Sequence, residues 1–270
     1  MKVDIGITVY AKPLRLQRLL DLMQEPREVR SLITVFEDPS SEEHARTYGQ
    51  LCRQRGIPYQ CAPQWGCMQG IIQYATERTS GDWFLYLPDD VMPTPQSITW
   101  ALRWMQLLPE HVAAFQMPYW NYDQLRTLNT WEERDNLFQE SPEWIAQVPL
   151  NPHWYGPALY LNVNGAGFAF RRKAWEAVGG FAQQTWCLDE DLSCKIWLRT
   201  DWTIVSVPGP PWIHQGGAST TDQHKFGHAH MRHATIEGWL DAWGESKDVL
   251  GERCRERMRL AGERTGWPVR

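Results

Sequence analysis

Apolar residues follow two different periods along the first hundred positions of the chain. Alternation over 3–9 predicts a strand, and apolar residues three and four apart over 16–23 predict a helix. The alternation of the two element types continues, with predicted strands over 31–38, 57–60 and 82–90 and predicted helices over 39–56 and 67–79. Strands that alternate with helices indicate an α/β domain with a mostly parallel sheet.

The second half of the chain is less regular. Residues 121–158 read as long loops with short helices, and residues 222–243 as a helix. Further elements are predicted as strands over 112–120, 161–170 and 202–207 and as helices over 171–178, 189–199 and 245–270. The last of these alternates charges and is expected to be a solvated helical tail. Without an internal repeat or a clear linker, the pattern predicts a single domain with this tail.

Composition narrows the classes of protein that fit this pattern. Of 270 residues, 43% are hydrophobic and 22% charged, which is typical of a globular protein. No apolar run approaches the ~20 residues that cross a bilayer, and no signal-peptide pattern opens the chain, so we expect a cytoplasmic protein without a membrane span. The net charge of −5 argues against a general nucleic-acid binder, and six scattered cysteines are expected to be reduced.

Two acidic clusters fall where predicted strands end, in "FED" at 36–38 and "PDD" at 88–90. In parallel sheets, ligands bind at the carboxyl ends of the strands, so both clusters belong to one edge. Adjacent carboxylates such as Asp89 and Asp90 suit a hard divalent cation bound together with a phosphate ligand. A solvated turn or a helix start before residue 94 explains the same pair and stays open.

Two other features carry candidate chemistry. The triplet Asp189–Asp191 opens a predicted helix, where a carboxylate can act as a general base or can simply complement the helix dipole. His214 follows a strand and a proline turn, and it is either a metal ligand or a surface-loop histidine. The histidines between His224 and His233 suit either a zinc site or, more simply, a solvated helix face.

Taken in order, these motifs resemble a family 2 glycosyltransferase of the GT-A fold. The resemblance is carried by "DIGITVYAKP", "ITVFEDPSS", "FLYLPDDV", and "NGAGFAFRRKAWEAVGGF" followed by "DEDLSCKIW", and it covers 3 to about 217. It implies a Rossmann-like, mostly parallel sheet flanked by helices. The implied domain spans 1–243, with a nucleotide-sugar half over about 1–120, an acceptor half over about 121–243, and a tail over 244–270.

The resemblance also implies roles for single residues. Contacts to the donor nucleotide fall on Thr8, Val9, Tyr10, Glu37, Asp38 and Asp89. A divalent metal, Mn²⁺ or Mg²⁺, falls on Asp90 and His214. The catalytic base falls on Asp191, with Asp189 as a rival, and contacts to the acceptor fall on Trp186 and Glu190.

The chain departs from the pattern of the family at three places. Pro88 replaces the first acid of the D-x-D motif, Glu37 replaces an aspartate, and residues 67–70 lack the usual arginine–asparagine pair. The first departure leaves Asp90 as the main metal ligand, and the last leaves the donor less defined.

The implied activity is inverting, metal-dependent transfer of a sugar from a nucleotide-diphosphate sugar to an acceptor hydroxyl. A UDP-sugar is the favoured donor. The acceptor stays open between a saccharide, a hydroxymethylated pyrimidine in phage DNA, a lipid-linked sugar and a protein hydroxyl. For a polyanionic acceptor, Arg171, Arg172, Lys173 and the arginines of the tail are candidate phosphate contacts. No obligate protein partner is evident.

Two other classes of function remain. One is a non-catalytic carbohydrate- or nucleic-acid-binding module on the same frame. The other is a sugar-phosphate nucleotidyltransferase, which usually has a glycine-rich loop after its first strand. "TVYAKPLRL" contains no glycine at that place, which counts against the nucleotidyltransferase.

Overall fold

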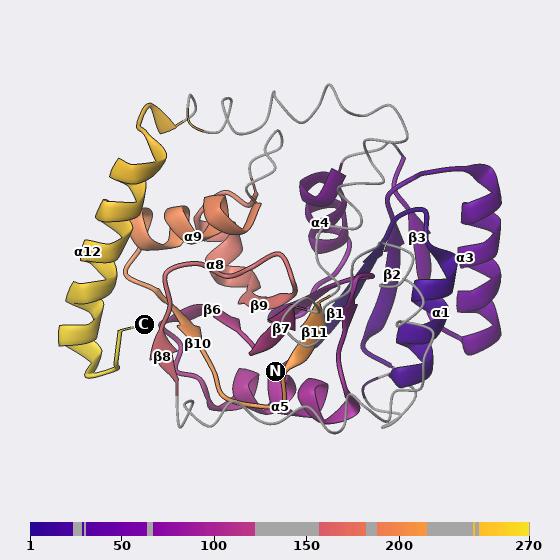
Figure 1. The fold of residues 1–270 in the computed structure, drawn as a ribbon, viewed down its shortest axis with the longest axis horizontal. Helices are drawn as coiled ribbons and strands as arrows, with labels where there is room; N and C mark the ends of the chain where they lie inside the picture. Colours follow the sequence, from indigo (N-terminus) through magenta and orange to yellow (C-terminus); the bar gives the residue numbers. More distant parts are fainter. Residues whose placement is uncertain are drawn as a thin grey trace.

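The centre of the protein is an eight-stranded sheet with the strand order β3-β2-β1-β4-β9-β6-β10-β8 (Figure 1). A computed structural model describes residues 1–23, 29, 31–63, 67–121, 157–181, 188–214, 240 and 243–269. The strands are β1 (Val3–Val9), β2 (Ile33–Glu37), β3 (Tyr59–Cys61), β4 (Trp83–Pro88), β6 (Val112–Gln116), β8 (Ala158–Leu159), β9 (Phe168–Arg171) and β10 (Thr203–Ser206). A small second sheet has the order β5-β11-β7, from β5 (Val91–Met92), β11 (Trp212–His214) and β7 (Tyr119–Asn121).

Most strands of the large sheet run in one direction. β1 is parallel to β2 and β4, β2 to β3, and β6 to β10. Two strands run the other way, because β9 is antiparallel to both β4 and β6, and β8 is antiparallel to β10. The predicted mostly parallel α/β sheet is confirmed, and the reversed strand β9 puts the loop before it at the edge where β4 and β6 end.

Helices cover the sheet and form both ends of the molecule (Figure 1). They are α1 (Pro13–Leu22), α3 (Glu42–Arg55), α4 (Cys67–Glu77), α5 (Pro95–Leu107), α8 (Arg172–Ala177), α9 (Leu188–Arg199) and α12 (Lys247–Thr265). Local sequence fixes several of their ends. Ser41 accepts from His44 N–H at the start of α3, and Gly56 closes it with a positive φ of 64°. Thr94 and Ser97 form a capping box at the start of α5.

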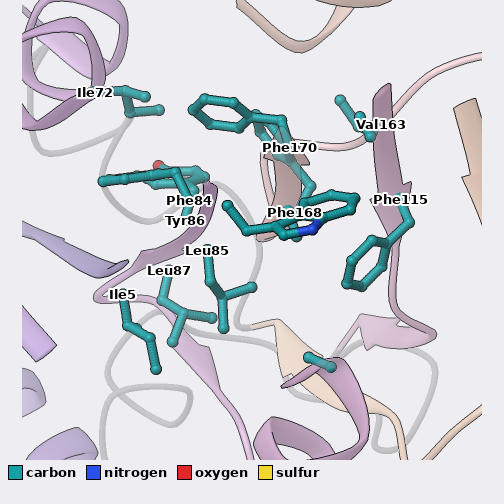
Figure 2. Packing of buried hydrophobic residues seen from close by; sticks show 14 of the residues in the cluster. Ile5, Ile72, Phe84, Leu85, Tyr86, Leu87, Phe115, Val163, Phe168 and Phe170 are labelled. Carbon is teal, nitrogen blue, oxygen red and sulfur yellow. The ribbon is translucent and has the colours of Figure 1, made fainter. Parts of the chain in front are cut away.

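The core combines aliphatic side chains with a cluster of aromatic side chains on neighbouring strands (Figure 2). The rings of Tyr86 and Phe168 lie 5.5 Å apart, and those of Phe84 and Phe170 lie 5.4 Å apart, across the antiparallel pair of β4 and β9. Such cross-strand aromatic pairs add to the free energy gained by burying their surface. They also fix the register of β9, which matters for the loop that precedes it.

The predicted C-terminal helix is confirmed as α12, and one of its faces is part of the core. Leu250, Cys254, Met258 and Ala261 are buried there against α9 and β8, while the charged residues face outward. The tail is therefore a packed amphipathic helix rather than a solvated one. The proposed boundary between donor and acceptor halves stays a prediction.

Some predictions fall outside the described residues, among them the helix over 222–243, the histidines from His224 to His233, and nearly all of the loop over 121–158. Cys52, Cys61, Cys194 and Cys254 are free thiols. In the part of the chain that the structure describes, no helix combines the length and the apolar character needed to cross a bilayer.

Candidate active site

The ends of three parallel strands are tied together at one edge of the large sheet. The N–H of Asp38, after β2, donates to the carbonyl of Val9 at 3.0 Å, and the N–H of Asp89, after β4, donates to the carbonyl of Thr8 at 3.0 Å. The two acidic clusters therefore flank the end of β1, as expected for carboxyl ends of parallel strands. Thr8 and Val9 are both buried, so the predicted contacts of their side chains with a nucleotide stay a prediction.

Asp89 is held inside this edge. Its Oδ2 accepts the Tyr10 N–H at 3.2 Å, and its side chain is buried. Burial raises the pKa of Asp89 to about 7, the positive charge of Arg15 acts against this rise, and Asp90 adds to it. Arg15 on α1 is only 5% exposed, and no sequence motif singles it out, because a basic residue in an amphipathic helix normally faces solvent.

Asp90 and His214 come together although 124 positions separate them in the sequence. Their strands meet in the small sheet, where Val91 pairs with His214, and Nε2 of His214 lies 3.5 Å from Oδ2 of Asp90. Burial acts to raise the pKa of Asp90, but His214 and then Arg15 oppose it, and the net pKa lies below its usual value.

The chemistry of this pair fits a hard divalent cation. Among the described residues there is no group of three or more His, Cys, Asp or Glu side chains that could hold a metal ion. One carboxylate and one imidazole are a partial ligand set, and Mg²⁺ or Mn²⁺ at such sites takes its other ligands from substrate phosphates and water. Asp90 and His214 could therefore supply two ligands to a cation whose other ligands come from a diphosphate and water.

Glu37 lies at the end of β2 and is fully buried. The hydroxyl of Tyr59 on β3 donates to its Oε2, while its Oε1 has no hydrogen-bond partner among the described residues. Burial raises the pKa of Glu37, and Tyr59 and Cys61 partly offset the rise. Asp38 is also buried, next to Glu37. Tyr59 was missed in the sequence because the short strand β3 carries no motif.

The acidic triplet at the start of α9 separates into three environments. Asp191 is 1% exposed, its Oδ2 lies 2.7 Å from Nζ of Lys195, and its Oδ1 accepts from Nε1 of Trp243 at 3.2 Å. Glu190 pairs with Lys247 of α12 at 2.7 Å. The side chain predicted as catalytic base is therefore engaged in a buried ion pair.

Asp189 is partly exposed. Its Oδ2 accepts from the N–H of Gly165 at 2.9 Å, in the loop before β9, and its Oδ1 accepts from the N–H of Glu190 at 3.0 Å. Burial raises its pKa, and the two backbone hydrogen bonds act in the opposite direction. Its negative charge contributes to the raised pKa of Tyr86 on β4 and of Tyr119 on β7, for both of which burial is the larger cause. The ring of Tyr119 lies edge-on to His214.

Other predicted contacts fall elsewhere. Trp186 lies outside the described residues. Arg171 donates to the carbonyls of Val112, Leu108 and Pro109, and Arg172 donates to Gly81 and Thr76 carbonyls and to the Thr79 hydroxyl. The guanidinium groups of Arg171 and Arg172 thus join elements inside the fold, and the suggestion that they contact phosphates stays a prediction.

The likeness to known proteins is consistent across sequence and structure. No protein-family model matches the chain. Over 264 residues it is 24% identical to the catalytic subunit of the UDP-forming cellulose synthase 1 of Komagataeibacter xylinus, covering 96% of this chain and 33% of that protein. The chain thus spans about a third of the length of the curated relative that it matches.

Solved structures show the fold. A mannosyltransferase from Pyrobaculum calidifontis, in complex with GDP-mannose and Mn²⁺, matches with a TM-score of 0.60 and 13% identity over 98% of this chain and 75% of its own. Glucosyl-3-phosphoglycerate synthase from Mycobacterium tuberculosis, with Mn²⁺, UDP and glucosyl-3-phosphoglycerate, matches with a TM-score of 0.54 and 14% identity over 99% and 81%. The predicted GT-A fold and the predicted resemblance to glycosyltransferases are confirmed.

Proposed function

We propose that this chain is an inverting, metal-dependent glycosyltransferase that moves a sugar from a nucleotide-diphosphate sugar to an acceptor hydroxyl. One observation carries the proposal: a GT-A fold combines a carboxylate–imidazole pair that suits a divalent metal with a partly exposed carboxylate. The pair is Asp90 with His214, and the carboxylate is Asp189. The mannosyltransferase and the synthase that share the fold were solved with GDP-mannose or UDP together with Mn²⁺, which supports the same donor class here.

Asp189, rather than Asp191, is the base in this proposal. A general base must reach the acceptor hydroxyl and must be ionised when it acts. Asp191 is shut in by Lys195 and Trp243, whereas Asp189 is partly exposed and keeps a raised pKa that suits proton abstraction. Asp189 would take the proton of the acceptor hydroxyl while the hydroxyl oxygen attacks the anomeric carbon of the donor sugar. The attack would come from the face opposite the leaving diphosphate.

Residues on the donor side would bind and neutralise the diphosphate. Asp90 and His214 would hold the cation, which when bound offsets the negative charge that grows on the leaving diphosphate. Tyr10 would present its backbone to the nucleotide, and Asp89, held by that backbone, would keep the strand end in shape. Asp38, buried beside Glu37, would bind the ribose or the base from the end of β2.

Glu37 supports a donor with an N–H group on its base. Its buried Oε1 accepts no hydrogen bond from the described residues, and an unsatisfied buried acceptor costs about 1–3 kcal/mol. Uracil and guanine both carry a ring N–H that would donate to this oxygen, whereas cytosine has an acceptor at the matching position. We keep the UDP-sugar as the favoured donor because the curated relative is UDP-forming.

A saccharide hydroxyl is the proposed acceptor. Three of the candidate contacts to DNA phosphates already bond to protein carbonyls, since Arg171 and Arg172 bond to backbone carbonyls and Arg257 caps α9 through the carbonyls of Trp197 and Thr200. A phage DNA base therefore has less support than a sugar. Glu190 stays a candidate acceptor contact beside Asp189, although it also pairs with Lys247.

The test combines donor binding with turnover. A thermal-shift panel of UDP, GDP, CDP and dTDP, each with and without Mn²⁺, should give a metal-dependent rise in Tm with UDP or GDP. Asp90→Asn and His214→Ala should abolish the metal-dependent part. Asp189→Asn should remove nearly all transfer without changing donor binding. A binding module would instead keep its ligand affinity in Asp189→Asn and show no turnover in the wild type, and that result would refute the proposal.

A comparison of the two aspartates makes the assignment of the base sharper. Asp191→Asn should reduce stability more than it reduces turnover per folded molecule, because it breaks a buried ion pair. If Asp191→Asn, once folded, lost turnover as completely as Asp189→Asn, the assignment of the base to Asp189 would be wrong.

A further inference from the structure

Gln116 is a buried amide at the carboxyl end of β6, in the middle of the large sheet, with 1% exposure. All of its polar atoms are used. Its Nε2 donates to the carbonyls of Gly167 at 2.7 Å and Met117 at 3.2 Å, and its Oε1 accepts from the N–H of Asn164 at 2.7 Å. One side chain thus holds both ends of the loop that precedes β9.

The same loop is bonded to the helix that carries Asp189. The N–H of Gly165 donates to Oδ2 of Asp189 at 2.9 Å, and the N–H of Val163 donates to the hydroxyl of Ser193 at 3.1 Å. Ser193 in turn donates to the backbone carbonyl of Asp189 at 2.5 Å. The position of the loop therefore decides where the Asp189 carboxylate points.

On its other side the loop packs against the strand that carries His214. Gly167 has a φ of +100°, and a Cβ there would lie 2.7 Å from the ring of Trp212 on β11 and 3.2 Å from the carbonyl of Tyr86 on β4. Only glycine allows this close approach. The loop thus lies between strands β4 and β11 on one side and helix α9, which carries Asp189, on the other.

We propose that Gln116 is a positioning residue for the transfer reaction. It acts through the loop over 163–167, which sets the Asp189 carboxylate relative to Asp90 and His214. The inference rests on the proposed function. A purely structural role would need only volume at this place, and a buried amide is costly unless its bonds are required. Here every bond goes to the loop or to its own strand end, which is the arrangement expected of a fixed support for a reacting group.

The test replaces the amide and keeps its volume. Gln116→Met fills similar space but releases the carbonyl of Gly167 and the N–H of Asn164. The expected result is a fall in kcat of about 100-fold, the loss expected when a reacting group is misplaced by about 1 Å, with the Kd of the donor within twofold of wild type. Ser206→Ala is the matched control, because Ser206 pairs with Gln116 in the sheet, is fully buried, and has no hydrogen-bond partner among the described residues.

A second readout does not depend on turnover. In Gln116→Met the loop is no longer held at Asn164 and Gly167, so the N–H of Gly165 between them should move away from Asp189. Because this N–H lowers the pKa of Asp189, the pKa should rise and the acid limb of kcat/KM should move to higher pH. The titratable groups that face Asp189 are Glu190 on its own helix, Tyr86 on β4 and Tyr119 on β7. The pKa is measured by carbon NMR on protein with labelled aspartate carboxyls, with the Asp189 signal assigned from its absence in Asp189→Asn.

Ser193→Ala keeps the inference open to refutation if Gln116→Met does not fold. It frees the N–H of Val163 and the Asp189 carbonyl with the loss of only one hydroxyl, and it should change kcat and the pKa of Asp189 in the same direction but by less. A folded variant of either kind whose kcat and Asp189 pKa both equal those of Ser206→Ala overturns the positioning role. If the wild type transfers no sugar at all, the proposed function fails, and the NMR titration still decides whether Gln116 sets Asp189.

Discussion

The ion pair between Asp191 and Lys195 leads to the prediction with the largest effect on stability. Lys195 is only 7% exposed, and its ammonium group lies 2.7 Å from Oδ2 of Asp191 and donates to the carbonyl of Gly180 at 2.9 Å. In Lys195→Met the methionine fills the space of the aliphatic stem, but the Asp191 carboxylate keeps only its bond from Trp243. A buried charge is then left without its counter-charge.

The magnitude follows from what each variant leaves buried. Breaking a buried ion pair from one side costs about 3–5 kcal/mol of unfolding free energy, which for a domain of this size lowers Tm by roughly 10 °C. Replacing both partners, in Asp191→Leu with Lys195→Met, removes the buried charges together. The double variant should lie within about 2 kcal/mol of wild type, because the Gly180 carbonyl and the Trp243 N–H each lose a bond worth about 1 kcal/mol.

Urea unfolding, followed by circular dichroism, measures these differences at fixed pH. The matched control is Lys247→Met, which breaks a lysine–carboxylate pair of the same 2.7 Å length whose lysine is 62% exposed, and it should cost less than about 1 kcal/mol. If Lys195→Met cost no more than Lys247→Met, or if the double variant were the least stable of the three, the description of Asp191 as half of a buried pair would be refuted.

Three further predictions concern other parts of the protein. Arg172→Ala should lower the free energy of unfolding in urea by about 3 kcal/mol, because it releases the carbonyls of Gly81 and Thr76. Arg103→Ala on the exposed face of α5 should lower it by less than about 0.5 kcal/mol, and equal losses in the two variants would contradict the prediction. Ala11→Gly should raise the unfolding free energy by about 1 kcal/mol, because Ala11 has a φ of 55° that glycine adopts without strain, and a loss of stability would show that the strain is absent. Activity should fall with decreasing pH at a higher pH than an ordinary aspartate predicts, since burial raises the pKa of Asp189 and the base works only when ionised; a kcat/KM profile with its acid limb near 4 would argue against this base.

Much of the fold could be predicted because, in the first half of the chain, the periodicity of apolar residues agreed with the glycine, proline and capping residues that end helices and strands. The second half shows where that reasoning ends. Residues 112–120 read as one strand, yet they form β6 and β7 in different sheets, because Pro118 between them has no N–H for a continuous ladder. Residues 161–170 also read as one strand, but only the part from Phe168 is one, since Gly167 turns the chain with a positive φ.

The site could be predicted where a motif marks it. Asp90 and His214 were chosen from the order of motifs along the chain, and the structure brings them to 3.5 Å. Gln116, Tyr59 and Arg15 could not be found in this way, because each lies in an element whose pattern only indicates burial or an amphipathic helix. The choice between Asp189 and Asp191 also needed the structure, because the partners of Asp191 are a lysine one turn away and a tryptophan 52 positions away.

The register of β9 sets the separation between the loop that contacts Asp189 and the acids that follow β4. This strand begins at the loop that holds Asp189 and lies beside β4, which is followed directly by Asp89 and Asp90. In this register Tyr86 pairs with Phe168 and Phe84 with Phe170. A slip of two residues would keep the aromatic rings inside but would carry the loop about 7 Å along the sheet, away from its place beside the acids. The separation between Asp189 and the Asp90–His214 pair thus depends on the aromatic packing of the core, and under the proposed function a core substitution that loosens this register would alter the reaction without touching either group.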